Sequence, residues 1–347
     1  MRSFIVSHNI TSPLGSDSAE NFSKMVSGTG SVRFVTDTAV CHTPAYLSVF
    51  SKHFENKFET ICEMSIRDAL QKCSVFPEDP GTLFILSTTK GNIGVPLNIT
   101  AGNIAKKFNF HNTPIVISNA CISGLLAITI AERLIKKGIY DAVAVTGADI
   151  LTDFIISGFQ SLKAIGSTPC RPFDANRDGI NLGECAATVI LSSKAEHGIE
   201  VMNGAFNSDA NHISGPSRTA EGLYLSISRT LAEGYTPDFI NAHGTATLFN
   251  DEMEAIGFDR AGLNHIPVNS FKGYIGHTLG AAGVAECIIS AMSIENNTVI
   301  ATKGYEDHGV TKNITIAGKN IVKPLKSCLK TASGFGGCNA SILLVKK

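Results

Sequence analysis

The sequence predicts a mixed α/β fold in which helices cover a mostly parallel sheet, and two observations support this prediction. Short apolar segments rich in β-branched residues alternate with longer segments of helical periodicity along most of the 347 residues. In addition, a strand followed by a polar turn and a small-residue helix occurs at 114–135 and again at 266–286. This repetition predicts an internally duplicated chain, which we divide into halves at 1–195 and 196–347.

The first half begins with an apolar strand and continues as alternating strands and helices. The expected strands are 3–7, 82–87, 114–117, 140–146 and 186–192, and the expected helices are 17–26, 64–73, 99–108 and 125–135. Residues 28–60 are irregular, and 166–183 form a polar loop too long to lack a structural or functional reason. Cys121 lies at the strand-to-helix turn, where the helix dipole favours the thiolate and lowers its expected pKa towards ~7.

The second half repeats this plan with other polar residues at the turns. The expected strands are 200–206, 239–242, 266–269 and 340–345, and the expected helices are 217–231, 252–260 and 278–286. His243 and His277 follow two of these strands, so they occupy turns comparable to that of Cys121. The small residues of 278–286 predict very close packing against another segment, and the glycine-rich turn 334–337 can direct backbone N–H groups at a ligand.

Composition excludes several classes of protein. The net charge of −1 gives no electrostatic basis for binding nucleic acid or an anionic membrane. Nine cysteines occur without a C-x-x-C pair or a clustered cysteine and histidine spacing, so we expect neither a disulfide framework nor a metal site. Because the thiols imply a reducing compartment and no long apolar run is present, we expect a cytoplasmic protein.

The motifs together resemble one family, the β-ketoacyl-acyl carrier protein synthases, which are the condensing enzymes of the thiolase superfamily. The resemblance rests on Asn119-Ala120-Cys121, Arg171-Pro172-Phe173-Asp174, Arg177-Asp178-Gly179, Gly183-Glu184, Asn241-Ala242-His243-Gly244-Thr245, Lys272, Gly276-His277, Gly280-Ala281-Ala282-Gly283, and Gly334-Phe335-Gly336-Gly337 with Asn339. It implies a thiolase-like fold of two βαβαβαββ halves that form five αβαβα layers. It also implies decarboxylative Claisen condensation of an acyl group with malonyl-acyl carrier protein, in fatty acid or polyketide biosynthesis.

The resemblance assigns a role to each catalytic candidate. Cys121 is expected to hold the acyl group, a task that requires a nucleophile able to form a thioester. His243 and His277 are expected to donate hydrogen bonds from neutral imidazoles to the malonyl thioester oxygen as carbon dioxide departs. Lys272 would tune the two histidines, and Glu286 would hold that lysine.

The resemblance also suggests how substrates bind. The backbone N–H groups of Cys121 and Phe335 would form an oxyanion hole, and Phe335 would act as a gate for the acyl chain. Thr245 and Thr247, together with Phe335 and Gly336, would contact the phosphopantetheine arm and the acyl group. The acidic carrier protein would dock on basic residues, first Lys163 and then Lys106 and Lys107.

The chain departs from the family pattern at one residue and in two segments. Ser333 stands where the family usually has a second phenylalanine, and segments 36–60 and 88–110 are short.

The resemblance also implies what binds to the protein. We expect no resident cofactor, because phosphopantetheine arrives on the carrier protein. We also expect a homodimer or a heterodimer formed through the strand before Cys121. Two alternatives stay open, a non-condensing chain-length-determining partner subunit and an acyltransferase of the same fold.

Overall fold

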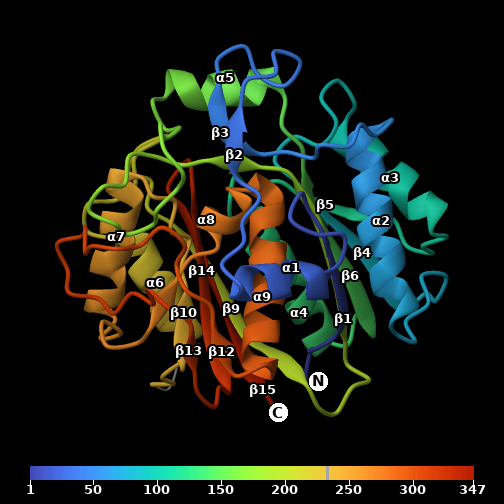
Figure 1. Cartoon of the computed structure of the whole chain (residues 1–347). Helices are drawn as coiled ribbons and strands as arrows, with labels where there is room; N and C mark the ends of the chain where they lie inside the picture. The colour runs from blue at the N-terminus through green and yellow to red at the C-terminus, as the bar shows by residue number, and fades with distance from the viewer. Residues whose placement is uncertain (232–233) are drawn as a thin grey trace.

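The computed structural model describes residues 1–231 and 234–347, and its first half alternates strands with helices (Figure 1). The elements are β1 (Phe4–Thr11), α1 (Ser18–Val26), β2 (Arg33–Val35), β3 (Ala45–Ser48), α2 (Lys57–Gln71), β4 (Thr82–Ser87), α3 (Leu97–Lys107), β5 (Ile115–Ile117), α4 (Ser123–Lys136), β6 (Ala142–Asp149), α5 (Asp153–Ser161), β7 (Leu182–Gly183) and β8 (Cys185–Ser192). The predicted boundary at 195/196 lies in the connection between β8 and β9.

The second half repeats the alternation. Its elements are β9 (Ile199–Ser208), α6 (Glu221–Thr230), β10 (Phe239–Asn241), α7 (Leu248–Arg260), β11 (Val268–Asn269), α8 (Lys272–Ile275), the 3₁₀ turn Leu279–Ala281, α9 (Ala282–Glu295), β12 (Thr298–Val299), β13 (Ile321–Val322), β14 (Ser327–Gly334) and β15 (Cys338–Lys346).

The strand order confirms the duplication. The ten strands of the main sheet follow the order β11-β10-β14-β15-β9-β1-β8-β6-β4-β5. Read outwards from the centre, the order is β1-β8-β6-β4-β5 in the first half and β9-β15-β14-β10-β11 in the second, which in each half is the first, fifth, fourth, second and third strand along the chain. In both halves the fifth strand is antiparallel to its two neighbours, and the outer three strands are parallel to one another. The two half-sheets join where β1 pairs with the beginning of β9.

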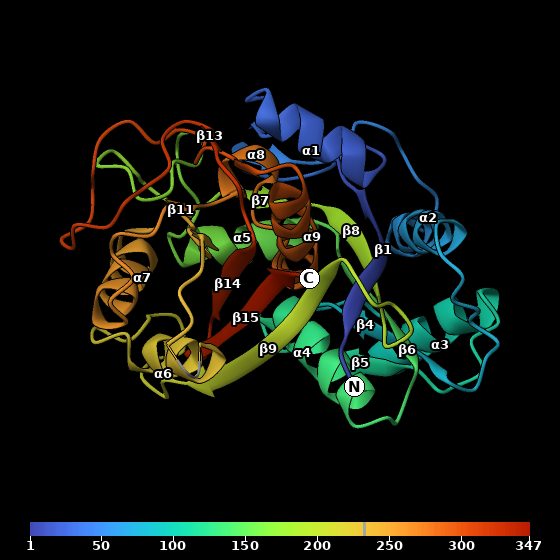
Figure 2. The same ribbon diagram turned by 90° about the horizontal axis from the view of Figure 1, so that it is seen from below.

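Helices complete the five αβαβα layers (Figure 2). Helices α2 and α3 cover the outer face of the first half-sheet, and α6 and α7 cover that of the second. Helices α4 and α9 form the middle layer, where each contacts both half-sheets and the other helix. The two helices touch through glycines: a Cβ atom added to Gly124 would lie 2.8 Å from the backbone nitrogen of Val284. The small residues of α9 are therefore required by this close approach, as predicted.

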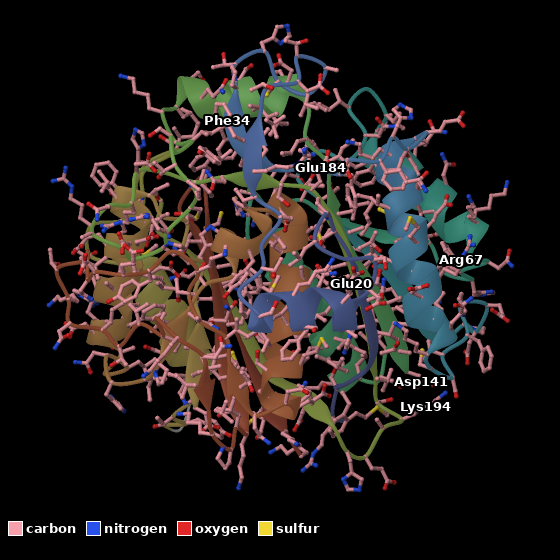
Figure 3. All side chains as sticks on the ribbon, viewed as in Figure 1. Glu20, Phe34, Arg67, Asp141, Glu184 and Lys194 are labelled. Carbon is pink, nitrogen blue, oxygen red and sulfur yellow. The ribbon has the colours of Figure 1, made fainter. Side chains whose placement is uncertain are left out.

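Most predicted elements are confirmed, but two expectations are wrong. The main sheet is mixed and not mostly parallel, because the fifth strand of each half and the junction of the halves pair antiparallel, and residues 28–60 contain strands β2 and β3. The other differences have local causes. Helix α2 begins at Lys57 and not at 64. The sequence prediction placed its start too late because the first turn has no side-chain cap that would mark it. Strand β14 was not predicted, because its buried residues include a lysine, a threonine and two serines in place of an apolar run. Side chains such as those of Arg67, Asp141 and Lys194 surround the layers at the periphery (Figure 3). Within the described ranges, no helix has the length and apolar character needed to span a bilayer.

Candidate active site

Cys121 lies in a tight turn between β5 and α4. The residue before it, Ala120, has a φ of +43°, a conformation that L-residues rarely adopt. The Ser123 hydroxyl stabilises this turn, because it donates to the carbonyl of Ala120 at 2.6 Å and accepts from the backbone N–H of Asn119 at 2.7 Å. The turn thus places the Cys121 thiol at the bottom of a cavity at the beginning of the central helix.

The protonation state of Cys121 differs from the expectation based on its helix position. Burial raises the pKa of the Cys121 thiol to about 12, although Lys272 and the backbone N–H of Phe335 both favour the thiolate. The expected shift towards ~7 is therefore wrong in direction, because desolvation outweighs the helix dipole. The cysteine rests as a neutral thiol and needs a nearby base when it reacts.

Two histidines lie beside the thiol, in the turns where the sequence predicted them. The sulfur of Cys121 and one ring nitrogen each of His243 and His277 all lie within 4.8 Å of one another. The imidazole rings are perpendicular, with their centroids 5.0 Å apart. Both nitrogens of His277 and Nδ1 of His243 are buried without a hydrogen-bond partner among the described residues. These ring nitrogens are therefore free to exchange hydrogen bonds with a substrate or a water that enters the site.

Burial, and next the charge of Lys272, holds the pKa of both His243 and His277 well below the usual value of 6.5. The two imidazoles are therefore neutral at pH 7. A neutral imidazole has one N–H donor and one free nitrogen, so it can accept the thiol proton or donate a hydrogen bond to an oxyanion.

Buried carboxylates hold the backbone around His243. Glu254 of α7 accepts hydrogen bonds from the backbone N–H groups of His243 and Gly244 at 2.8 and 2.7 Å. Asp251, one turn earlier on the same helix, accepts from the backbone N–H of Thr245 at 3.0 Å. Helix α7 therefore fixes the course of the turn that carries His243.

The long polar loop 166–183 holds His277 from the other half of the chain. The backbone N–H of His277 donates to the carbonyl of Asn181 at 2.7 Å, and the N–H of Gly183 donates to the carbonyl of His277 at 2.9 Å. A Cβ atom at Gly183 would lie only 2.0 Å from the carbonyl oxygen of Ile275. The structural reason expected for this loop is thus the placement of a histidine from the second half.

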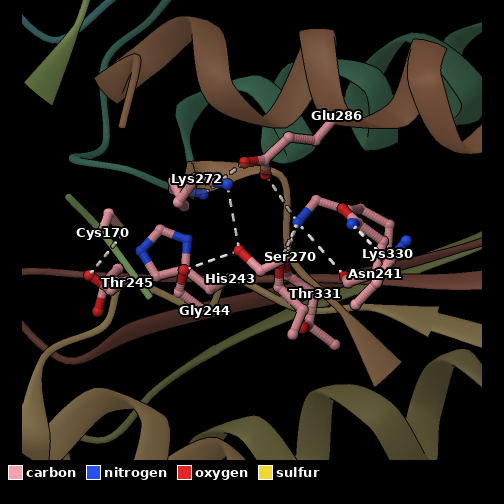
Figure 4. A network of polar contacts seen from close by, with 12 residues as sticks. Cys170, Asn241, His243, Gly244, Thr245, Ser270, Lys272, Glu286, Lys330 and Thr331 are labelled. Carbon is pink, nitrogen blue, oxygen red and sulfur yellow. Dashed lines mark hydrogen bonds and ion pairs between the residues drawn. The ribbon is translucent and has the colours of Figure 1, made fainter. Parts of the chain in front are cut away.

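A buried ionic cluster of Lys272, Glu286 and Lys330 lies close to His243 (Figure 4). The carboxylate of Glu286 pairs with Lys272 Nζ at 2.5 Å through one oxygen and with Lys330 Nζ at 2.8 Å through the other. Burial by itself would raise the pKa of Glu286, but Lys272 and Lys330 together hold it below its ordinary value. Sequence reasoning found Lys272 and Glu286 but missed Lys330, whose strand β14 lies inside the main sheet between β10 and β15.

A cavity of about 520 Å³ opens from the three reactive groups to the surface. Thr245 and Thr247 line it, and their hydroxyl oxygens are 2.9 Å apart. The ring of Phe335 stacks on Phe159 of α5, with the centroids 5.6 Å apart, and is partly exposed beside the cavity. The backbone turn that contains Gly336 forms another part of the wall.

The predicted docking lysines lie in two different places. Lys163 lines the outer part of the cavity and is exposed. Lys106 and Lys107 end helix α3 and are not among the cavity-lining residues, and Lys107 pairs with Glu63 of α2 at 2.5 Å. The structure thus brings Lys163, and not the second pair, to the site.

The glycine-rich turn approaches Cys121 directly. It is the hairpin between β14 and β15, in which Gly334 pairs with Cys338. A Cβ atom at Gly334 would lie 3.0 Å from the backbone nitrogen of Cys121, so glycine allows the two backbones to meet. Within the hairpin, the hydroxyl of Ser333 donates to the Asn339 side chain at 2.8 Å.

Known structures share this architecture over the whole chain. A ketosynthase in complex with its chain length factor from Xenorhabdus doucetiae superimposes with a TM-score of 0.86 at 22% identity, covering 100% of this chain and 98% of its own. A type II polyketide ketosynthase solved with its acyl-carrier protein gives 0.90 at 21% identity, with coverage of 100% and 99%. The fold is therefore the thiolase-like fold of ketosynthases.

The sequence itself identifies the family. Residues 78–197 match the N-terminal domain of β-ketoacyl synthases, and 199–306 match their C-terminal domain. The chain belongs to the β-ketoacyl synthase family. The 3-oxoacyl-[acyl-carrier-protein] synthase 2 of Rhizobium meliloti is 32% identical over 272 residues, which cover 72% of this chain and 64% of that protein. The protein of the same name from Coxiella burnetii is 31% identical, with coverage of 72% and 66%. The chain thus spans slightly less than two thirds of these relatives' length.

Proposed function

We propose that this protein is a β-ketoacyl-acyl carrier protein synthase, which condenses an acyl group held on Cys121 with malonyl-acyl carrier protein to give 3-oxoacyl-acyl carrier protein. The observation that carries the proposal is the convergence of the Cys121 thiol with two neutral, unpaired imidazoles in one buried site. A chain-length-determining partner without condensing activity would have no need of this complete set of groups.

The first half-reaction moves the acyl group to the enzyme. The Cys121 thiol gives its proton to an imidazole nitrogen, and the sulfur attacks the thioester carbonyl carbon of the acyl carrier protein. The carbon–sulfur bond to phosphopantetheine then breaks, and the departing thiolate takes the proton. The N–H groups of Cys121 and Phe335 stabilise the intermediate oxyanion, a contribution of roughly 10² to 10³ in rate for each donor.

The second half-reaction forms the carbon–carbon bond. Malonyl-acyl carrier protein loses carbon dioxide, and the electron pair of the broken bond passes into an enolate whose oxygen accepts hydrogen bonds from His243 and His277. The enolate carbon attacks the acyl carbon on Cys121, the carbon–sulfur bond to Cys121 breaks, and the released thiolate takes up a proton from solvent. The imidazoles suit this task because low pKa values keep them neutral donors near a buried negative charge.

Substrate contacts, partners and location belong to the same proposal. Thr245, Thr247 and Gly336 would contact the phosphopantetheine arm or the acyl group, which arrives on the carrier protein, so no resident cofactor or metal takes part. The half-buried strand β5, at the edge of the sheet, would pair with a second subunit, identical or not. The nine free cysteines fit a cytoplasmic location.

Intact-protein mass spectrometry after incubation with acyl-acyl carrier protein tests the proposal. We expect one acyl adduct on the wild-type chain and none on Cys121→Ala. His277→Ala should still gain the adduct but should release little carbon dioxide from malonyl-acyl carrier protein. An adduct that persists in Cys121→Ala, or carbon dioxide release at the wild-type rate in His277→Ala, would contradict the assigned roles.

A further inference from the structure

Lys330 is a fully buried lysine that the mechanism above does not use. It lies on β14 directly beside Asn241, the last residue of β10, with which it pairs in the sheet. His243 comes two residues after the end of β10. A lysine in this position requires explanation, because lysine is almost never fully buried without a partner and its desolvation is costly.

The Lys330 ammonium connects two segments of the site. It pairs with Glu286 of α9 at 2.8 Å and donates to the backbone carbonyls of Thr331, Ala242 and Asn241 at 2.6, 3.1 and 3.4 Å. Ala242 immediately precedes His243, whereas α9 begins shortly after His277. One side chain thus ties the helix that follows one histidine to the backbone that precedes the other (Figure 4).

The neighbouring residue extends the same connection. The hydroxyl of Thr331 donates at 3.1 Å to Glu254, whose carboxylate holds the backbone N–H groups of His243 and Gly244. Two successive residues of β14 therefore stabilise the turn that carries His243. Lys330 does so through its ammonium group and Thr331 through its hydroxyl. The charges of Lys272 and Lys330 also contribute to the low pKa of both imidazoles.

Stability alone gives little reason for this arrangement. Glu286 already has a partner in Lys272, and replacing buried ion pairs by apolar residues of similar volume is often neutral or stabilising. A second buried cation that contacts the backbone beside a reactive histidine is better explained by the geometry of the site.

We propose that Lys330 is a positioning residue for His243 and His277, holding Glu286 and the Ala242 carbonyl so that the two imidazoles keep the spacing needed for malonyl decarboxylation. This inference rests on the proposed condensing function. It assigns the second half-reaction as the step most sensitive to Lys330, because deprotonation of Cys121 needs only one imidazole, whereas the enolate oxygen is held by both.

The variant Lys330→Met tests this, because methionine keeps most of the length and removes the charge and the donors. We expect acylation of Cys121 within about twofold of wild type and a fall of about 10- to 100-fold in carbon dioxide release from malonyl-acyl carrier protein, both measured per folded molecule. Lys330→Gln, which keeps an N–H donor without the charge, should lie between Lys330→Met and wild type.

Lys57→Met is the matched control. It removes the lysine that pairs at 2.8 Å with another buried carboxylate, that of Glu184, at the start of α2 and away from the cavity lining. It should lower the unfolding temperature without changing the ratio of the two half-reactions. An equal fall in both half-reactions of Lys330→Met, unchanged decarboxylation, or failure of both Lys330 variants to fold would overturn the proposal. If the wild type itself releases no carbon dioxide, the proposed function fails instead.

Discussion

Replacing Gly124 by alanine should separate the two central helices and disturb the site at their ends. The new Cβ atom would lie 2.8 Å from the Val284 nitrogen, 3.0 Å from the Gly283 Cα and 3.1 Å from the Gly280 carbonyl oxygen. Ordinary contacts begin at 3.4 Å, so the closest overlap of about 0.6 Å falls on backbone that cannot rotate away. Overpacking of this kind costs about 1 to 3 kcal/mol.

The expected loss can be measured by thermal unfolding. At about 2.1 cal/mol/K per residue, 347 residues give an unfolding entropy of about 0.7 kcal/mol/K, so the melting temperature should fall by about 1.5 to 4 °C. Cys121 precedes α4 and His277 precedes α9, so the displacement of the two helices also changes the distance between these side chains. This displacement should slow acylation of Cys121 by about tenfold or more.

Gly102→Ala is the control for Gly124→Ala. Gly102 lies in helix α3, and a Cβ atom there would meet nothing within 4 Å. Alanine at this position should stabilise the protein by about 0.5 to 1 kcal/mol, because glycine is a poor helix residue. If Gly124→Ala melted at or above the wild-type temperature with unchanged acylation, the close packing of α4 on α9 would not limit the site.

Three further outcomes are expected. Because burial lowers the pKa of His243 and His277 below 6.5, and that of His8 to about 4, the unfolded chain binds more protons below pH 6.5. Urea titrations should therefore show each histidine lowering stability by up to about 1.4 kcal/mol per pH unit below pH 6.5, opposed in part by Asp251, whose pKa burial raises to about 7; a slope that does not become shallower in His8→Gln would contradict the burial of His8 as a neutral group. Charge reversal in Lys163→Glu should raise KM for acyl-acyl carrier protein several-fold and leave KM for a free pantetheine thioester unchanged, with Lys107→Glu as the comparison; equal effects on both substrates would place Lys163 outside the docking surface. Chelators should not reduce condensation, whereas added Zn²⁺ should inhibit it reversibly by binding the thiol and the two imidazoles; inactivation by a chelator would show that a metal takes part.

Much of the fold could be predicted from the sequence because its pattern is local. The apolar periodicities of helix α4 and strand β4 predict both the kind of element and its position in the sequence. The glycines of α9 predict a close contact but do not indicate which segment makes it. Strand β14 could not be predicted in this way. Its polar side chains are buried because Lys330 and Thr331 find partners on α7, α9 and β10, and such partners are defined only by the tertiary fold.

The site shows the same division between local and tertiary information. Cys121 and the two histidines could be found because each follows a strand and matches a family motif. The pKa of Cys121 could not, because the helix dipole is a local effect, whereas desolvation depends on the whole environment of the thiol. The role of loop 166–183 also required the structure, because its hydrogen bonds to His277 join residues almost 100 positions apart.

That loop shows how the two halves of the chain have diverged. β5 and β11 occupy equivalent outer places in their half-sheets, but β5 is followed by Cys121 and β11 by Lys272 and His277. β4 and β10 are equivalent too, yet the second residue after β4 is Thr89, whereas the second residue after β10 is His243. Two copies of one unit have thus specialised into a single composite site, in which the first half supplies the thiol and the backbone support for a histidine of the second. Neither half contains a complete site by itself. The two halves of one chain therefore complement each other, as the two subunits of a heterodimer would.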